Sequence, residues 1–395
     1  MTDNNASTTW PPARGDRDAF AAEFGEDLAN RFQQAFWTVD PVADALFTSG
    51  HSVKEIMPNL RDALHRGEAN DETFPEVAEF IEDMKKALDG IDAEKFERGR
   101  RVYLSIPPLV HGVAVGPGSL IHTYSTPAIA DLLVNTGELT VGAIKRLAYT
   151  TNWTYSLYLP DSIQPGNVGF VHSGMVRAMH AHVRRVHNNR GFDYTDWGAP
   201  INELDMFRTW FDFTTIPYKA LEDMGWKLTK EEQQDIYYLW QVVGRMIGIN
   251  SDLMEGMDDM ESSQRTLDAV HFVDGEPNEN SQALVDSLMS GFVVNVNELT
   301  GLPKESLKEW TEAYARIMHG DEVCDGYNIP RTTMQPILEM NIPAVTERFE
   351  LLRANPEALD KEIATNEQII REVLDDQNPS YLKQDDGIKT ADDAA

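Results

Sequence analysis

The chain has 395 residues, of which 34 are basic and 65 acidic, so its formal net charge is −31. Hydrophobic residues make up 42% of it, which is enough for a sizeable core and excludes disorder of the whole chain. The charge argues against nucleic acid and anionic membranes as partners, because both require a basic protein face.

The first residues, 1–17, are polar and lack the basic start and apolar run of a secretion signal. We expect a disordered N-terminal segment there. No stretch approaches the ~18–20 uninterrupted apolar residues of a membrane span. The sequence therefore predicts a cytoplasmic protein without a membrane span, although a removed leader would leave no trace.

Helical periodicity recurs almost everywhere between Asp18 and Asp376, and alternating apolar and polar residues are rare. We predict an all-α protein with one domain over residues 18–375, because no repeat or linker divides it. Residues 376–395 are acidic and nearly free of apolar side chains, which predicts a disordered tail. The sequence Gly116-Pro117-Gly118 indicates a turn.

Two consecutive helices are expected in the second quarter of the chain. Pro127 follows two possible capping residues and begins a helix that stops at Gly137. Thr140 caps the next helix, which runs to about Tyr158 and is ended by Pro160.

One face of this second helix carries polar side chains at spacings of three or four, namely Arg146, Tyr149, Thr150 and Trp153. Hydrogen-bond donors grouped in this way can stabilise negative charge that develops on a reacting oxygen. In the alternative interpretation, Arg146 pairs with Glu138 on the surface and Tyr149 is a half-buried core residue. The spacing alone favours neither.

The following helix holds the most informative segment, residues 175–184. Helical winding places a basic stripe beside an apolar ridge. The stripe contains Arg177, His180, Arg184 and His187, and the ridge contains Val176, Met179, Val183 and Val186. Ser173 is the expected N-cap, and the helix should end by Gly191.

A basic stripe of this kind suits haem. Neutral imidazole binds iron, and arginine binds carboxylates bidentately, while a porphyrin offers an apolar face and two propionates. His180 is thus the candidate iron ligand, and Arg177 and Arg184 are the candidate propionate partners. The alternative is a basic amphipathic helix whose arginines meet some of the many carboxylates of this chain.

The remaining helices show core features. Thr229 and Glu232 form a capping box before a helix with regularly spaced apolar residues. Residues 202–223 are rich in aromatic side chains, which is more typical of a core than of a cofactor site.

Other chemistries lack their motifs. The sequence has no His-Glu-x-x-His, no Glu-x-x-His and no Gly-x-Ser-x-Gly elbow after a strand. The single cysteine, Cys324, excludes an internal disulfide, a cysteine-ligated cluster and covalent c-type haem attachment. Acidic neighbours raise the pKa of this thiol and suit a turn. Any haem is therefore held non-covalently, and Cys324 is the alternative axial ligand.

Two motifs resemble those of a known family. Arg146-x-x-x-Thr150 followed by Met179-His180-Ala181-x-Val183-Arg184 is similar to the latex-clearing-protein type rubber oxygenases. Their wider family includes the fungal oxygenase of mycophenolic acid biosynthesis, which cleaves a prenyl side chain. The likeness extends through 200–205 and Trp240-x-x-x-Gly244-x-x-x-Gly248.

The resemblance implies a globin-like helical domain that encloses haem b. His180 would be the proximal iron ligand, with Arg177 and Arg184 near the propionates and Arg146 and Thr150 on the distal side. It also implies use of dioxygen to cleave a carbon–carbon double bond in an isoprenoid-like, hydrophobic substrate.

Tyr149 departs from the rubber-cleaving pattern, in which a lysine occupies this position. A phenol can donate a hydrogen bond but is uncharged at neutral pH. The acidic residue of that subgroup has no clear counterpart, since neither Asp131 nor Glu138 fits the spacing.

We therefore expect a haem b dependent oxygenase, in which Arg146, Tyr149 and Thr150 act on the distal side. A non-enzymatic haem-binding or gas-sensing protein is the alternative from another class. A peroxidase or peroxygenase would keep the fold and replace dioxygen with peroxide.

Overall fold

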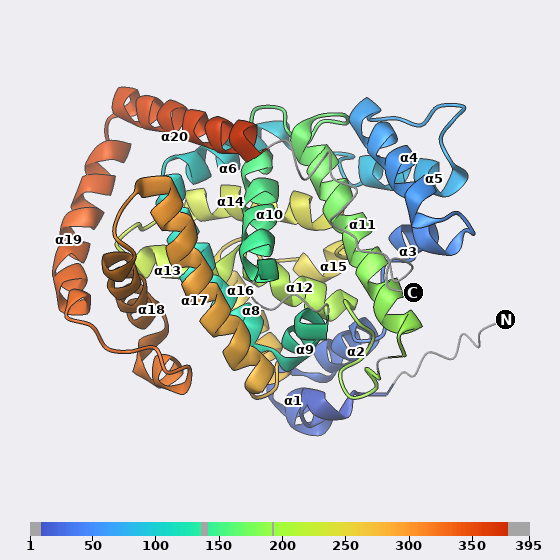
Figure 1. Ribbon diagram of the computed structural model, residues 1–395, viewed down its shortest axis with the longest axis horizontal. Coiled ribbons are helices and arrows are strands. Elements are labelled where there is room, and N and C mark those ends of the chain that lie inside the picture. The colour runs from blue at the N-terminus through green and yellow to red at the C-terminus, as the bar shows by residue number, and fades with distance from the viewer. Residues whose placement is uncertain (1–8, 136–140, 192, 378–395) are drawn as a thin grey trace.

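The computed structural model describes residues 9–135, 141–191 and 193–377, and the side chains of 141–146, 376 and 377 are outside this description. The described residues form helices and contain no strand, which confirms the all-α prediction (Figure 1). The first helices are η1 (Pro12–Arg14), α1 (Arg17–Phe24), α2 (Glu26–Ala35), α3 (Pro41–Thr48), α4 (Val53–Arg66), α5 (Pro75–Lys86) and α6 (Ala93–Leu104). The middle ones are α7 (Pro108–Val115), η2 (Gly116–Leu120), α8 (Ile121–Ser125), α9 (Pro127–Asn135), α10 (Val141–Leu157) and α11 (Val168–Asn189).

The second half of the chain adds further helices that complete the domain. They are α12 (Glu203–Phe211), α13 (Thr215–Asp223), α14 (Lys230–Met246), α15 (Ser251–Met254), α16 (Met260–Phe272), α17 (Glu279–Thr300), α18 (Lys304–Gly326), α19 (Met334–Arg353) and α20 (Pro356–Gln377). Helices α19 and α20 lie on the outside, along one edge of the molecule (Figure 1).

Helix α14 crosses the centre of the core. Thr229 and Glu232 begin it with the predicted capping box, in which each side chain bonds to the backbone of the other residue. Ile236, Trp240 and Val243 follow at helical spacing and are buried. The apolar face of α14 therefore anchors the surrounding helices, among which α6 packs most extensively against it.

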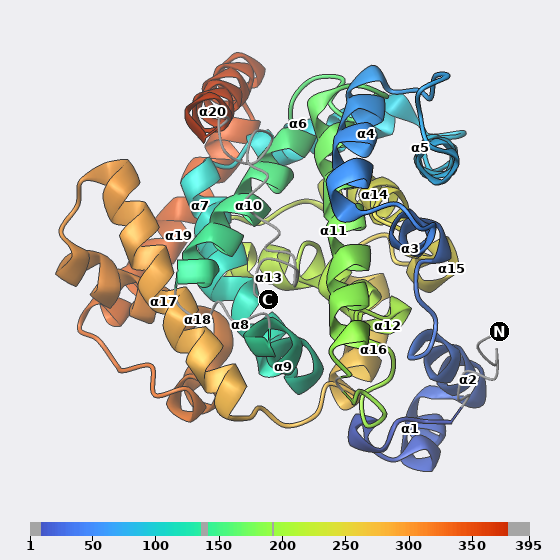
Figure 2. The same cartoon turned by 45° about the vertical axis from the view of Figure 1, so that its right-hand side comes forward.

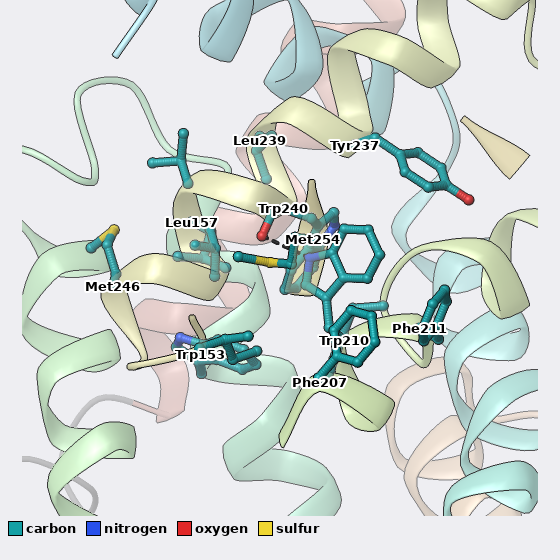
Figure 3. Close-up of a cluster of buried hydrophobic side chains, with 14 of the residues drawn as sticks. Trp153, Leu157, Phe207, Trp210, Phe211, Tyr237, Leu239, Trp240, Met246 and Met254 are labelled. Carbon is teal, nitrogen blue, oxygen red and sulfur yellow. Dashed lines mark hydrogen bonds between the residues drawn. The ribbon is translucent and has the colours of Figure 1, made fainter. Parts of the chain in front are cut away.

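Aromatic side chains from three helical regions meet beside α14 (Figure 3). The ring centroids of Trp153 and Phe213 are 5.4 Å apart, and those of Phe213 and Trp240 are 4.8 Å apart. Trp210 donates its indole N–H to the Trp240 carbonyl at 2.9 Å. These contacts confirm that the aromatic segment 202–223 belongs to the core.

The N-terminal segment is folded from residue 9, so the prediction of disorder over 1–17 is wrong for residues 9–17. Arg14 is 1% exposed, and its Nη2 lies 2.6 Å from Oδ1 of Asp205. A polar composition suggested disorder, but a long-range ion pair holds this segment against α12. Residues 1–8 lie outside the described part.

The sequence Gly116-Pro117-Gly118 does not form a turn, and its prediction is corrected. It begins the buried π-helical segment η2 between α7 and α8. A Cβ at Gly116 would lie 2.9 Å from the Phe292 ring, and one at Gly118 would lie 2.9 Å from Sδ of Met318. These glycines therefore allow close packing rather than a change of chain direction.

The helix boundaries around the histidine segment agree with prediction at most points. Helix α10 ends at Leu157, before Pro160, and α11 ends at Asn189, before Gly191. The N-cap of α11 is Asn167, however, and Ser173 lies inside the helix. The burial of Phe170 and Val171 explains this extension by one and a half turns. Thr140 and Gly137 lie outside the described residues.

Cys324 lies in helix α18 rather than in a turn, and it is fully buried. Burial raises the pKa of its thiol to about 11. Helix α20 continues to Gln377, so the prediction of a disordered tail over 376–395 is wrong for residues 376 and 377, and residues 378–395 lie outside the described part. Within the described part no single helix has the length and composition of a membrane span, although the bent pair of 93–104 and 108–125 meets these criteria together.

Candidate functional site

Helices α10 and α11 form a hairpin that positions the predicted site. Trp153 Nε1 donates to Ser173 Oγ at 3.1 Å, where the end of α10 meets the start of α11. From this contact the two helices diverge in both views (Figures 1 and 2). Arg146 precedes Trp153 by seven residues and His180 follows Ser173 by seven, so each backbone position lies about 10 Å from the contact at 1.5 Å per residue. The backbones of Arg146 and His180 therefore lie at similar distances along their helices from the Trp153–Ser173 contact.

His180 has a buried, unpaired ring nitrogen. The side chain is only half-buried, but its Nδ1 atom is inaccessible and has no hydrogen-bond partner among the described residues. Burial, reinforced by the charge of Arg184, lowers the pKa of His180 to about 4. The imidazole is therefore neutral at physiological pH and keeps a lone pair for a Lewis acid.

A small cavity of about 30 Å³ adjoins His180. Asp40, Arg177, Arg184, Met206 and Gly248 are among the residues that line it. Its volume is about that of one water molecule. The walls of this cavity combine apolar side chains with the charged groups of Arg177 and Arg184, which form ion pairs with aspartates.

Arg177 pairs with two aspartates. Its Nε and Nη2 donate to Asp40 at 2.6 and 3.0 Å, and its Nη1 lies 2.7 Å from Oδ2 of Asp83, at an angle outside that of a hydrogen bond. The guanidinium also lies 5.1 Å from the centre of the Phe80 ring. The two aspartates thus neutralise the charge of Arg177, and Asp40 accepts most of its hydrogen bonds.

Arg184 is matched in the same way, by Asp44. Its Nε and Nη2 lie 2.9 and 2.8 Å from the Asp44 carboxylate, and its Nη1 donates to the Ile201 carbonyl at 2.8 Å. The structure therefore shows the carboxylate pairing that the sequence left open as an alternative. Contact of Arg177 and Arg184 with propionates stays a prediction.

The distal residues are only partly described. Tyr149 and Thr150 are half-buried on α10, and the Thr150 carbonyl accepts a hydrogen bond from Thr154 Oγ1 at 2.7 Å. The side chain of Arg146 lies outside the described residues, as does that of Glu138, its alternative partner.

A second cavity, of about 10 Å³, lies behind the aromatic layer of α10 and α14. Its polar side chains include Tyr103, Tyr158, Tyr218, His111 and Trp240. Burial raises the pKa values of the three phenols and lowers that of His111 to about 4, so all four groups are neutral. The sequence gave no signal for this cluster, because its members come from four separate helices and the segment after α10.

No group of three or more His, Cys, Asp or Glu side chains in the described part of the chain has the geometry of a metal site. His180 thus has no companion ligands there. This donor set differs from that of a di-iron carboxylate centre, which needs several carboxylates around its metals.

Comparisons with known proteins agree with the all-α fold. The solved structure of latex clearing protein in the closed state has a TM-score of 0.64 with this chain at 18% identity, covering 93% of this chain and 95% of the other. The rubber oxygenase of Streptomyces sp. strain K30 is 23% identical over 312 residues, which cover 76% of this chain and 71% of that protein.

The sequence profile described as "ER-bound oxygenase mpaB/B'/Rubber oxygenase, catalytic domain" matches residues 108–346. This range includes α10, α11 and α14, and therefore both motifs and the aromatic layer between them. On this match, the chain belongs to the mpaB and rubber oxygenase family of oxidoreductases.

Proposed function

We propose that this chain is a haem b dependent oxygenase that uses dioxygen to cleave a carbon–carbon double bond in a hydrophobic, isoprenoid-like substrate. The observation that carries the proposal is that His180, a neutral imidazole whose Nδ1 is buried and unpaired, borders one cavity together with Arg177 and Arg184 in a member of an oxygenase family. A lone imidazole fits a metal whose other positions are filled by a porphyrin.

His180 would hold the haem iron, which when bound supplies the site for dioxygen chemistry. Thr150 and Tyr149 would donate hydrogen bonds from α10, and Arg146 would add a positive charge on the same face. Arg177 and Arg184 would lie near the propionates, as the sequence predicts, while keeping their aspartate partners. With a propionate added, Arg184 would face two carboxylates and Arg177 three.

The apolar character of the interior supports a hydrophobic substrate. Trp153, Phe213 and Trp240 pack next to the hairpin and offer flat apolar surfaces without charge. The name of the Streptomyces relative refers to rubber, a polyisoprene, and supports an isoprenoid-like compound as the first substrate class to test.

The proposal is tested first by replacing His180. The His180→Ala variant should lose the Soret band or most of its bound haem, because it lacks the iron ligand. His182→Ala is the matched control, since His182 lies on the same helix but packs on Phe47, with ring centroids 5.1 Å apart. Full haem occupancy and activity in His180→Ala would refute the ligand assignment.

Activity is tested by aerobic incubation of the haem-loaded protein with unsaturated isoprenoids and analysis of carbonyl products. Arg146→Ala should leave the haem content intact and reduce turnover. A protein that binds haem but yields no product would support the sensing or haem-binding alternative, and a requirement for peroxide would support a peroxygenase.

A further inference from the structure

The second cavity lies between α6, α7, α10, α13 and α14 and is lined by rings and neutral polar groups. Its volume of about 10 Å³ suits a single oxygen-sized group. His111 is neutral because burial lowers its pKa to about 4, and its Nε2 donates to the Tyr103 carbonyl at 2.8 Å. None of the described residues that line the cavity is an arginine, a lysine or a carboxylic acid, so a charged ligand would have no counter-charge there.

Two hydrogen-bond donors at this cavity have no partner among the described residues. They are the Tyr158 hydroxyl and Nε1 of Trp240, and both atoms are inaccessible to solvent. Tyr158 as a whole is 0% exposed and Trp240 is 2% exposed. Unpaired buried donors are costly and rare in folded proteins. Two of them at one cavity therefore indicate a group that the protein binds there.

The unpaired indole N–H of Trp240 lies close to two phenol oxygens. Burial raises the pKa values of Tyr158 and Tyr218, and the Trp240 N–H acts on both in the opposite direction. An N–H lowers the pKa of a phenol only when it lies near the phenol oxygen. A carbonyl oxygen has two lone pairs and can accept from the indole N–H and a phenol O–H at the same time.

One side of α10 connects this cavity with the predicted distal residues. Thr150, Thr154 and Tyr158 follow one another at a spacing of four and so lie on the same side of the helix. Thr154 lines the cavity, and its hydroxyl donates to the Thr150 carbonyl at 2.7 Å. At 1.5 Å per residue, Tyr158 lies about 12 Å along the axis from Thr150. An elongated substrate can therefore extend from one to the other.

We propose that the second cavity binds an uncharged oxygen of the substrate, such as a ketone carbonyl, which accepts hydrogen bonds from Trp240 and Tyr158. This inference rests on the proposed function and narrows its substrate class. The isoprenoid carries an oxygen function about 12 Å from the double bond that reacts near Thr150. A pure hydrocarbon lacks this oxygen and leaves both donors unpaired, so it is the poorer ligand.

The first test measures binding by calorimetry without dioxygen, so that no turnover occurs. The probes are farnesylacetone, which is an isoprenoid ketone, and the hydrocarbon in which a CH₂ group replaces its carbonyl. The haem-loaded wild type should bind the ketone about 10- to 100-fold more tightly, because only the ketone satisfies the two donors. Farnesylacetic acid, which is ionised at neutral pH, should bind less tightly than the ketone.

The second test removes one donor. Tyr158→Phe should lower the ratio of ketone to hydrocarbon affinity by about 10-fold. Tyr237→Phe is the matched control, because its hydroxyl lies 2.8 Å from Thr215 Oγ1 and it does not line the cavity, and it should leave the ratio unchanged. The infrared C=O stretch of the bound, isotope-labelled ketone should lie at a lower frequency in the wild type and in Tyr237→Phe than in Tyr158→Phe.

The outcomes separate this inference from the proposed function. A wild-type protein that prefers the ketone but shows no haem spectrum supports the oxygen site and contradicts the proposed function. Equal affinities for ketone and hydrocarbon in a haem-loaded, active protein contradict the oxygen site alone. Equal losses of stability in Tyr158→Phe and Tyr237→Phe without any isoprenoid would show that water already satisfies the phenol, which also overturns the oxygen site.

Discussion

Individual buried polar atoms show where this protein departs from ordinary core packing. Most have partners, as in the Arg14–Asp205 ion pair, but a minority have no hydrogen-bond partner among the described residues, and these include Nδ1 of His180, the Tyr158 hydroxyl and Nε1 of Trp240. The indole of Trp240 lies near enough to Tyr158 to lower its pKa slightly against burial, without hydrogen-bond geometry. Such unpaired groups cost stability and therefore mark positions that serve a purpose other than stability.

The unpaired phenol leads to a stability prediction. Tyr158→Phe removes no hydrogen bond, so the free energy of unfolding should stay the same or rise by up to about 1 kcal/mol. Tyr237→Phe is the control, because its hydroxyl lies 2.8 Å from Thr215 Oγ1, and it should lose about 1 kcal/mol. Urea denaturation measures both, and an equal loss in the two variants would show that the Tyr158 hydroxyl has a partner.

Single elements differ in how far the sequence predicts them. Helix α14 could be predicted because its capping box and apolar spacing are local signals, and the same holds for the ends of α10 and α11. The π-helical segment η2 could not, since Gly116 and Gly118 have the composition of a turn and only contacts with Phe292 and Met318 reveal their role.

The candidate site divides in the same way. His180 and its arginines share one helix, so their common face follows from spacing alone. Asp40 and Asp44, which neutralise these arginines, lie 137 and 140 residues earlier in the chain. Pairs at such separations have no local signal.

Residues of α8 and α12 meet at Asp212, which predicts a pH dependence. Asp212 follows α12 and pairs with Arg208, and its carboxylate accepts Thr123 Oγ1 from α8 at 2.6 Å. Burial raises the pKa of Asp212 to about 6, against the effect of Arg208. A raised acid pKa means that the folded state holds the proton more tightly, so this stabilisation is present below the unfolded pKa and is lost as the pH rises through 6.

The free energy of unfolding of the wild type, relative to Asp212→Asn, should therefore fall by about 2 kcal/mol between pH 4 and pH 6 and level off above about pH 7. Urea denaturation of both proteins across this range measures the difference. A difference that is flat or rises with pH would contradict the raised pKa.

The N-terminal segment gives a second prediction at this scale. Arg14→Ala leaves the Asp205 carboxylate buried without its cation and should cost about 3–5 kcal/mol, and adding Asp205→Asn should recover part of the loss. Arg17→Ala is the control, since its Glu26 partner is exposed and the pair should contribute little to stability. Equal effects of Arg14→Ala and Arg17→Ala would show that the segment is not held by this pair.

The whole molecule carries 65 acidic residues and 34 basic ones, and some of the basic residues are buried arginines. Arg14, Arg177, Arg184 and Arg208 each pair internally with an aspartate. The remaining charge is a largely unbalanced negative surface that repels itself.

Salt should therefore stabilise the fold. Screening of the surface repulsion is nearly complete above about 0.15 M, where the Debye length is about 8 Å, while the buried pairs are screened much less. The melting temperature should rise between 10 and 200 mM KCl by roughly a few degrees. A melting temperature that falls over this range would show that attractive ion pairs dominate the surface.

The central claim is that His180 of α11 holds haem iron within this oxygenase fold. The most direct measurement is the absorption spectrum of the purified protein, first oxidised and then reduced with dithionite, for the wild type and His180→Ala. The account predicts a Soret band that shifts on reduction in the wild type and is lost or strongly reduced in the variant. A colourless wild-type protein from haem-replete cells, or an identical spectrum for His180→Ala, would contradict it.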